Sequence, residues 1–153
     1  MANILIIEDD PALLKLYGTI LSRVGYSVTL TDSGEAGIEA ARHSPPDLVI
    51  LDLVLPGIPG VEVARRLRQN RILPEARLIA ISGMGQEFTG AMGECINATV
   101  ILIKPFGVSL MLDAVEKALA SPAPSALQAN PGSTSNTSDF LDQANKRDVK
   151  LNE

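Results

Sequence analysis

Residues 47–57 of this chain read Asp47-Leu48-Val49-Ile50-Leu51-Asp52-Leu53-Val54-Leu55-Pro56-Gly57. An unbroken apolar run ends at Asp52, and a Pro-Gly turn follows a few residues later. A run of this kind predicts a strand that is buried on both faces, as in parallel sheets. An acid at the end of such a strand needs a metal ion or a lysine as partner, because a lone charge is costly to bury. On this stretch alone, Asp52 could equally be a solvated residue that opens a turn.

Similar runs recur along the chain, and a helical pattern follows each of them. The further strands are expected at 3–7, 26–30, 77–81 and 99–103, and the helices at 11–24, 32–43, 61–69, 87–96 and 108–120. Five strands that alternate with five helices predict an α/β fold of one domain, with helices on both faces of a parallel sheet.

Two of the expected helices have faces that can be assigned from the apolar spacing. In helix 61–69 the inward residues are Val61, Ala64 and Leu67, and the outward residues are Arg65, Arg66 and Arg68. In helix 108–120 the expected buried face is Leu110, Leu112, Val115 and Leu119.

Composition limits the kind of protein this can be. Of 153 residues, 46% are hydrophobic and only 3% aromatic, which predicts a single aliphatic core. A net charge of −5 argues against a nucleic-acid partner, and the single cysteine excludes an intramolecular disulfide. No leader or membrane-spanning run is apparent, so we expect a cytoplasmic protein without a membrane partner. From residue 121 the sequence turns to Pro, Ala, Ser, Asn and Thr, which predicts a domain at 1–120 and a disordered low-complexity tail at 121–153.

Polar residues follow four of the five expected strands. They are Glu8 and Asp9, then Asp52, Ser82 and Lys104. Because parallel strands end at the same edge of a sheet, we expect these side chains to converge. Three carboxylates repel one another unless a hard cation such as Mg²⁺ neutralises them. The arrangement suits an anionic group that arrives at Asp52, above all a phosphoryl group, with Lys104 and a hydroxyl as partners.

Each of these residues also has a plainer interpretation. Glu8 and Asp9 could merely complement the positive end of the helix that follows them. Asp10 precedes Pro11 and is typical of a helix N-cap rather than a metal ligand. Ser82 by itself would be an ordinary turn residue.

Four fragments occur in order at strand ends: Ile4-Leu5-Ile6-Ile7-Glu8-Asp9-Asp10, Pro46 through Gly57, Ile81-Ser82-Gly83 and Lys104-Pro105-Phe106. Through them, residues 1–120 resemble the receiver domain of the bacterial response regulators, the CheY-like family. The resemblance implies a flavodoxin-like, doubly wound sheet of strand order 2-1-3-4-5.

The resemblance also implies a role for each site residue. Asp52 would accept a phosphoryl group from a sensor histidine kinase or a histidine phosphotransfer protein. Glu8, Asp9 and Asp52 would bind Mg²⁺, while Ser82 and Lys104 would contact the phosphoryl oxygens. The bond between Lys104 and Pro105 is expected to be cis.

One position departs from the family pattern. An aromatic residue often stands three residues before the lysine and moves inward on activation, but here the residue is Ile101. A β-branched side chain is stiff and has no ring to exchange between positions. The signal is therefore expected to pass through Ser82 and the glycine-rich segment that begins at Gly83.

The expected function is that of a stand-alone switch, which is not an enzyme beyond slow autophosphorylation and autodephosphorylation. No DNA-binding segment is recognisable after residue 120, so output is expected to go to an unknown protein target. A rival is a haloacid-dehalogenase-like phosphatase with Asp52 as nucleophile, although the second acid of that family would fall at Val54. A scaffold that works without phosphorylation is a third interpretation.

Overall fold

The computed structural model describes residues 1–69, 72 and 77–122, along which five strands alternate with five helices. The strands are β1 (Asn3–Ile7), β2 (Ser27–Thr31), β3 (Leu48–Asp52), β4 (Arg77–Ser82) and β5 (Val100–Ile103). The helices are α1 (Pro11–Arg23), α2 (Gly34–His43), α3 (Gly60–Gln69), α4 (Gln86–Cys95) and α5 (Val108–Ala120). All ten elements therefore lie where the sequence predicts them, with ends shifted by one or two residues.

The strands form one parallel sheet in the order β2-β1-β3-β4-β5, which confirms the flavodoxin-like arrangement. Strand β3 lies at the centre, where Leu51 pairs with Ile7 of β1 and with Ala80 of β4. Every residue of β3 is buried, as the apolar run before Asp52 indicates. The central position of β3 places Asp52 in the middle of the sheet's carboxyl edge.

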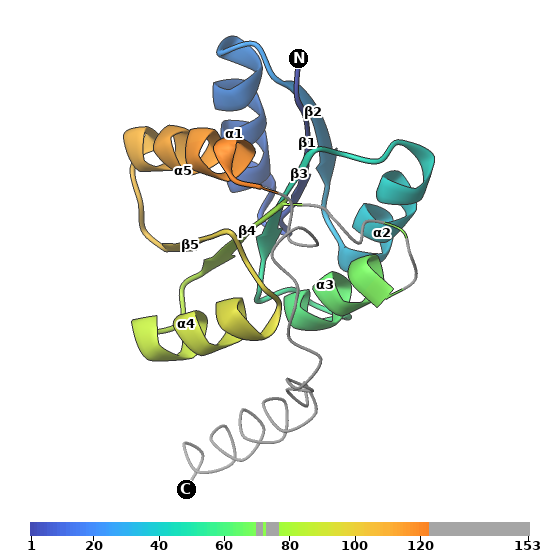
Figure 1. Cartoon of the computed structure of the whole chain (residues 1–153), viewed down its shortest axis with the longest axis vertical. Coiled ribbons are helices and arrows are strands. Elements are labelled where there is room, and N and C mark those ends of the chain that lie inside the picture. Colours follow the sequence, from blue (N-terminus) through green and yellow to red (C-terminus); the bar gives the residue numbers. More distant parts are fainter. Residues whose placement is uncertain (70–71, 73–76, 123–153) are drawn as a thin grey trace, which may run out of the picture.

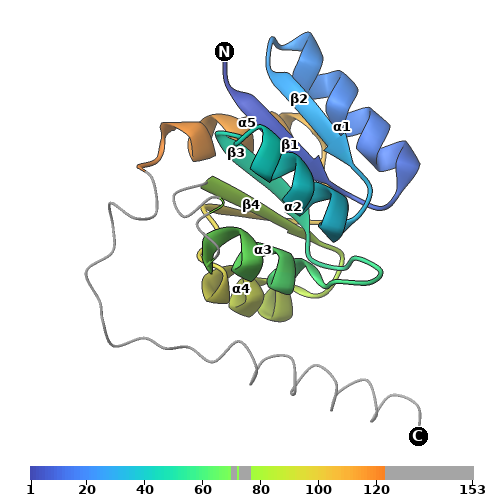
Figure 2. The ribbon, with the colours of Figure 1, turned by 90° about the vertical axis from the view of Figure 1, so that its right-hand side faces the viewer.

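Helices cover both faces of the sheet. One apolar cluster joins the strands to α1 and α5, and a second joins them to α2, α3 and α4. Figure 1 shows α1 and α5 on one side of the strands and α2 and α3 on the other. In Figure 2, α2 and α3 lie in front of the strands. Two covered faces explain why most strand residues are apolar without alternation.

Local signals set several helix starts. The Asp10 carboxylate accepts hydrogen bonds from the backbone N–H groups of Ala12 and Leu13, which caps α1. The Ser33 hydroxyl accepts one from Ala36 and caps α2. Asp10 is thus occupied as a helix cap, in agreement with the plainer of its two interpretations.

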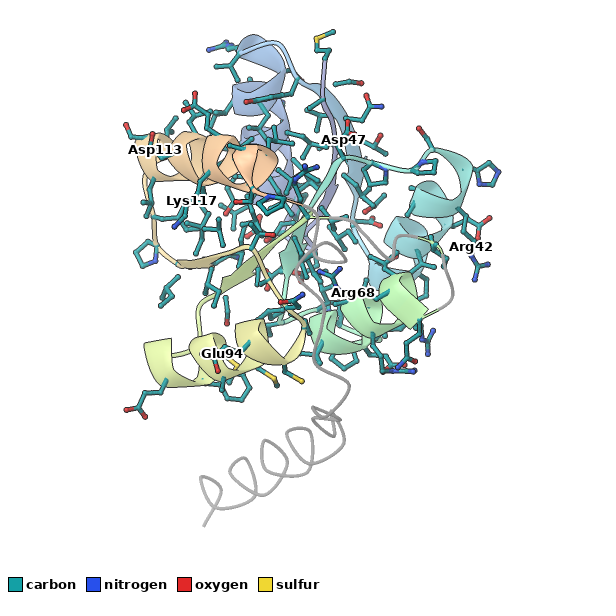
Figure 3. All side chains as sticks on the ribbon, in the orientation of Figure 1. Arg42, Asp47, Arg68, Glu94, Asp113 and Lys117 are labelled. Atoms are coloured by element: carbon teal, nitrogen blue, oxygen red, sulfur yellow. The ribbon has the colours of Figure 1, made fainter. Side chains whose placement is uncertain are left out.

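Two details of side-chain placement differ from expectation. Helix α5 buries Met111, Ala114, Val115 and Ala118, whereas Leu110 is 52% exposed. The small alanines let α5 approach the sheet closely, and the larger leucines fall to the flanks. Arg68 does not simply point outward, because its guanidinium donates hydrogen bonds to the carbonyl groups of Ile96 and Asn97 after α4. Arg68 is labelled on α3 in Figure 3.

The predicted tail at 121–153 lies outside the described residues from position 123 onward, so its disorder stays a prediction. No helix in the described ranges is long and apolar enough to cross a membrane.

Candidate functional site

Asp52 is held by contacts to both of its carboxylate oxygens. Its Oδ2 accepts a hydrogen bond from Lys104 Nζ at 2.8 Å, and its Oδ1 accepts one from the backbone N–H of Val54 at 2.8 Å. The residue is buried, with 4% of its surface exposed. A buried carboxylate needs such partners, and Lys104 provides the opposite charge that the sequence led us to expect.

Glu8 is buried beside the same lysine. Its Oε2 lies 3.1 Å from Lys104 Nζ, and its Oε1 accepts a hydrogen bond from the Asp10 backbone N–H. Burial and the neighbouring Asp52 carboxylate raise the pKa of Glu8 from 4.5 to about 7, although Lys104 opposes the shift. Glu8 and Asp52 therefore compete for one cation, and the site favours either a proton on Glu8 or more positive charge.

Lys104 remains a cation throughout the ordinary pH range. Burial by itself would lower the pKa of Lys104, but hydrogen bonds to Asp52 and Glu8 outweigh burial and raise that pKa to about 12. Its side chain thus bridges the two buried acids and links β5 to β1 and β3.

The three predicted metal ligands lie together. Glu8, Asp9 and Asp52 each offer an oxygen, and these oxygens lie within 4.8 Å of one another. Asp9 is exposed, so a cation held here would keep access to water. Few protein oxygens and several retained waters are what Mg²⁺ prefers. The donor set, with excess negative charge around Glu8, therefore fits Mg²⁺.

Ser82 and Lys104 come from neighbouring strands. Ser82 pairs with Ile103 in the sheet, and its carbonyl accepts a hydrogen bond from the Lys104 backbone N–H at 2.8 Å. The buried Ser82 hydroxyl accepts one from the backbone N–H of Met84. The bond from Lys104 to Pro105 is cis, as the resemblance implies. The five predicted site residues thus end β1, β3, β4 and β5 at one edge.

Sequence reasoning missed the residues that support this edge. A Cβ at Gly60 would lie 2.4 Å from the carbonyl oxygen of Asp52, so only glycine lets α3 begin against the end of β3. Tyr17 stacks on Phe106 with ring centroids 5.9 Å apart, which ties α1 to the segment after Lys104. Gly60, the second glycine of Pro56-Gly57-Ile58-Pro59-Gly60, could have indicated the close approach of α3 to the end of β3. Nothing in the sequence pairs Tyr17 with Phe106.

Three other positions complete the comparison with expectation. Ile101 is half-buried on β5 and packs against α4, where a Cβ at Gly93 would lie 2.3 Å from its Cδ1. Gly83 is exposed directly after Ser82. The side chain of Val54 is 52% exposed beside Asp52 and offers no acid at the place where the rival phosphatase would need one.

Comparisons with known proteins agree with this geometry. Residues 4–116 match the sequence profile of the family described as "Response regulator receiver domain". The chain is 34% identical over 119 residues to response regulator ArlR of Staphylococcus epidermidis, covering 78% of this chain and 53% of that protein. It is 36% identical over 119 residues to the "DNA-binding dual master transcriptional regulator RpaA" of a Synechocystis strain, covering 78% and 49%. The chain thus spans about half the length of these curated relatives.

A solved structure supports the same assignment. The crystal structure of "a putative response regulator from Chloroflexus aurantiacus" superimposes on this chain with a TM-score of 0.74 at 28% identity. The match covers 78% of this chain and 98% of that one. With the profile match over most of the folded part, the chain belongs to the response regulator receiver domain family. It is thus the receiver domain of a response regulator of the two-component type.

Proposed function

We propose that this domain is a phosphorylation-activated switch in which Asp52 accepts the phosphoryl group. The observation that supports this role is the pairing of Asp52 with Lys104 at 2.8 Å, beside Glu8 and Asp9, whose oxygens lie within 4.8 Å of one another and of Asp52 and can share a cation. The donor would be the phosphohistidine of a sensor histidine kinase or a histidine phosphotransfer protein. Mg²⁺ held by Glu8, Asp9 and Asp52 would neutralise phosphoryl oxygens during transfer.

The chain's own residues have separate parts in this proposal. An Asp52 oxygen attacks phosphorus and forms an acyl phosphate, and the imidazole of the donor leaves. Lys104, already a cation next to Asp52, stays close enough to pair with a phosphoryl oxygen. The Ser82 hydroxyl donates a hydrogen bond to another phosphoryl oxygen and draws the segment after it toward Asp52. Without an acid at Val54 to assist a water, hydrolysis of the acyl phosphate is expected to be slow, which agrees with a switch rather than a phosphatase.

We propose that the phosphorylated domain acts on a downstream protein in the cytoplasm. The phosphoryl group adds about −2 charges at the carboxyl edge, which can shift the populations of the loop after Ser82 and of α4. The relative RpaA is named as a DNA-binding regulator, but this chain covers only 49% of its length. For the 153 residues in hand, a net charge of −5 favours a protein target over nucleic acid.

The test is phosphoryl uptake from acetyl phosphate with Mg²⁺, read by intact mass. The wild type is expected to gain one phosphoryl group, and Asp52→Asn none. Asp47→Asn is the matched control, because Asp47 is an exposed acid before the opposite end of β3, and its carboxylate accepts a hydrogen bond from the Asn3 backbone N–H (Figure 3). Equal uptake by the wild type and Asp52→Asn would show that Asp52 is not the phosphoacceptor. Full uptake in excess EDTA would show that the reaction does not require a metal ion.

A further inference from the structure

A groove of about 490 Å³ runs between helix α1 and the edge strand β2, away from Asp52. Its lining residues are Lys15, Gly18, Thr19, Ser22, Arg23, Val28 and Leu30. Figures 1 and 2 both show α1 beside β2 at the end of the sheet. The floor is apolar, since the side chains of Val28 and Leu30 point to the α1 side, and Leu30 is 44% exposed.

The backbone along this groove is free to pair with another strand. Strand β2 pairs only with β1 in the described sheet. The N–H of Ser27 donates to Ala2, and the carbonyl of Thr31 accepts from Glu8, so alternate residues from Ser27 point toward β1. The N–H and C=O groups of Val28 and Leu30 therefore point to the outer edge, because these groups alternate along a strand in a sheet.

Two cations stand on the opposite wall of the groove. Lys15 and Arg23 are exposed on α1, and neither has an ion-pair partner among the residues that the structure describes. They are eight residues apart, which corresponds to about 12 Å along a helix. The wall between them carries only small uncharged residues. Two cations without an ion-pair partner in the described residues thus extend from helix positions about 12 Å apart along the α1 axis, above an apolar floor.

We propose that this groove binds an extended segment of a partner protein, which adds to the edge of β2 as a sixth strand. The outward groups of Val28 and Leu30 supply its main-chain hydrogen bonds. Four residues of an extended strand span about 13 Å, close to the separation of Lys15 and Arg23. Side chains at positions i, i+2 and i+4 of the segment point the same way, so the segment has acids at i and i+4 and an apolar residue at i+2.

A second copy of this chain does not fit the groove. Pairing of two β2 edges about a two-fold axis would bring Lys15 and Arg23 of one copy against the same cations of the other. Like charges across such a contact are destabilising. The charges therefore favour an acidic partner.

The probe is the peptide acetyl-Gly-Glu-Thr-Val-Thr-Glu-Gly-amide, titrated into the full chain and followed by amide chemical shifts. Shifts are expected along β2 and from Lys15 to Arg23. Bound peptide should slow hydrogen exchange at Val28 and Leu30 but leave Ser27 and Thr29 unchanged, because only the first pair points outward. A peptide of the same composition in the order Glu-Glu-Thr-Thr-Val is the sequence control. Asp52→Asn should bind equally well, which separates this test from that of the proposed phosphoacceptor.

Charge variants complete the test. Lys15→Gln and Arg23→Gln should each weaken binding by up to about fivefold, the range for an exposed ion pair. Lys117→Gln is the matched control, an exposed cation on α5 without an ion pair in the described residues (Figure 3). The double variant Lys15→Glu/Arg23→Glu should instead bind the peptide with lysines at i and i+4. The proposal is wrong if both Glu peptides bind alike, if Val28 and Leu30 gain no protection, or if the same shifts appear with protein concentration alone.

Discussion

Glu8 is a buried acid that shares its only described counter-charge, Lys104, with Asp52. Only 2% of its surface is exposed. Burial and Asp52 raise the pKa of Glu8 to about 7. The metal-free domain therefore holds a proton on Glu8 at mildly acid pH, and a divalent cation would have to displace that proton.

The raised pKa of Glu8 makes the stability of the metal-free domain depend on pH in a defined direction. Below pH 4.5 the carboxyl is protonated in both folded and unfolded chains, and stability gains nothing from further acid. Between 4.5 and about 7 the folded chain keeps a proton that the unfolded chain has released, so stability falls as pH rises; above about 7 the loss is complete. Glu8→Gln, which is always neutral, should escape this loss.

We therefore predict that, in EDTA, Glu8→Gln melts higher than the wild type at pH 8 and nearly level with it at pH 4.5. The difference at pH 8 should be on the order of 1 to 3 kcal/mol. Thermal unfolding across this range measures it, with Glu116→Gln, an exposed acid on α5, as control. A gain that stays constant from pH 4.5 to 8 would show that Glu8 does not retain its proton in the folded chain. Added Mg²⁺ should shrink the difference, because it stabilises the charged carboxylate.

The position of Glu8, Asp9, Asp52, Ser82 and Lys104 at one edge of the sheet could be predicted from the sequence, because each ends a recognisable strand or closely follows one. It could not predict which of the carboxylates holds the proton. The protonation of each acid depends on how deeply it is buried and on where Lys104 Nζ lies. Glu8, Asp52 and Lys104 come from strands far apart in the chain, so their contacts cannot be read from local sequence.

At the scale of elements, α4 and β5 meet through a closely fitted pair of residues, Gly93 and Ile101. Ile101 packs where a side chain on Gly93 would otherwise stand, with only 2.3 Å between its Cδ1 and a Cβ built there. Gly90 lies one turn earlier in α4 and has nothing within 4 Å of a Cβ. These two glycines in one helix differ in what surrounds them, which permits a matched comparison.

Gly90→Ala is predicted to stabilise the domain by about 0.5–1 kcal/mol, because alanine favours a helix over glycine. Gly93→Ala is predicted to lose this gain and to destabilise by about 1–2 kcal/mol, since its methyl group overlaps Ile101. Denaturant unfolding measures both. Adding Ile101→Ala should recover part of the Gly93→Ala loss, and strictly additive effects would show that the two positions are not in contact.

Activation is expected to show in α4 and the loop before it. Ile101 is stiff at its first torsion and held by α4, so β5 has little freedom to respond. The segment 83–86 follows Ser82 directly and contains two glycines, so a pull on the Ser82 hydroxyl can reorder it. With beryllofluoride as phosphoryl mimic, hydrogen exchange should slow more across 83–93 than in β5. Protection centred on Ile101 and its strand neighbours, with 83–93 unchanged, would contradict this route.

The order of helices and strands was accessible from the sequence because apolar runs and caps are local signals. The faces of the helices were less accessible. Helix α5 carries one leucine-rich stripe and one alanine-rich stripe side by side. Hydrophobicity alone favoured the leucine-rich stripe as the buried face. Close packing on the sheet instead selected Met111, Ala114, Val115 and Ala118, which only the shape of the opposing strands can determine.

At the scale of the whole molecule, the start of β4 contacts the residue that follows α5. The Arg77 guanidinium donates a hydrogen bond to the carbonyl oxygen of Ser121 at 2.8 Å. Residues up to Pro122 are described, and the two apolar clusters draw on no described residue after Leu119. The Arg77 contact places Ser121 against the folded domain, while the predicted bounds of 1–120 for the domain and 121–153 for the tail stay a prediction.

We predict that a chain ending at Pro122 keeps the melting temperature and the phosphoryl uptake of the full chain. Its apolar clusters and all five proposed site residues are retained, and the removed segment has the composition of a solvated tail. A chain ending at Ala120 should keep phosphoryl uptake but lose about 1 kcal/mol, because Arg77 loses the Ser121 carbonyl as acceptor. Arg77→Gln in the full chain is the control: if that hydrogen bond is the cause, truncation at Ala120 should destabilise the Arg77→Gln variant much less than the wild type. A large loss of stability already at Pro122 would instead show that residues 123–153 contribute packing to the domain.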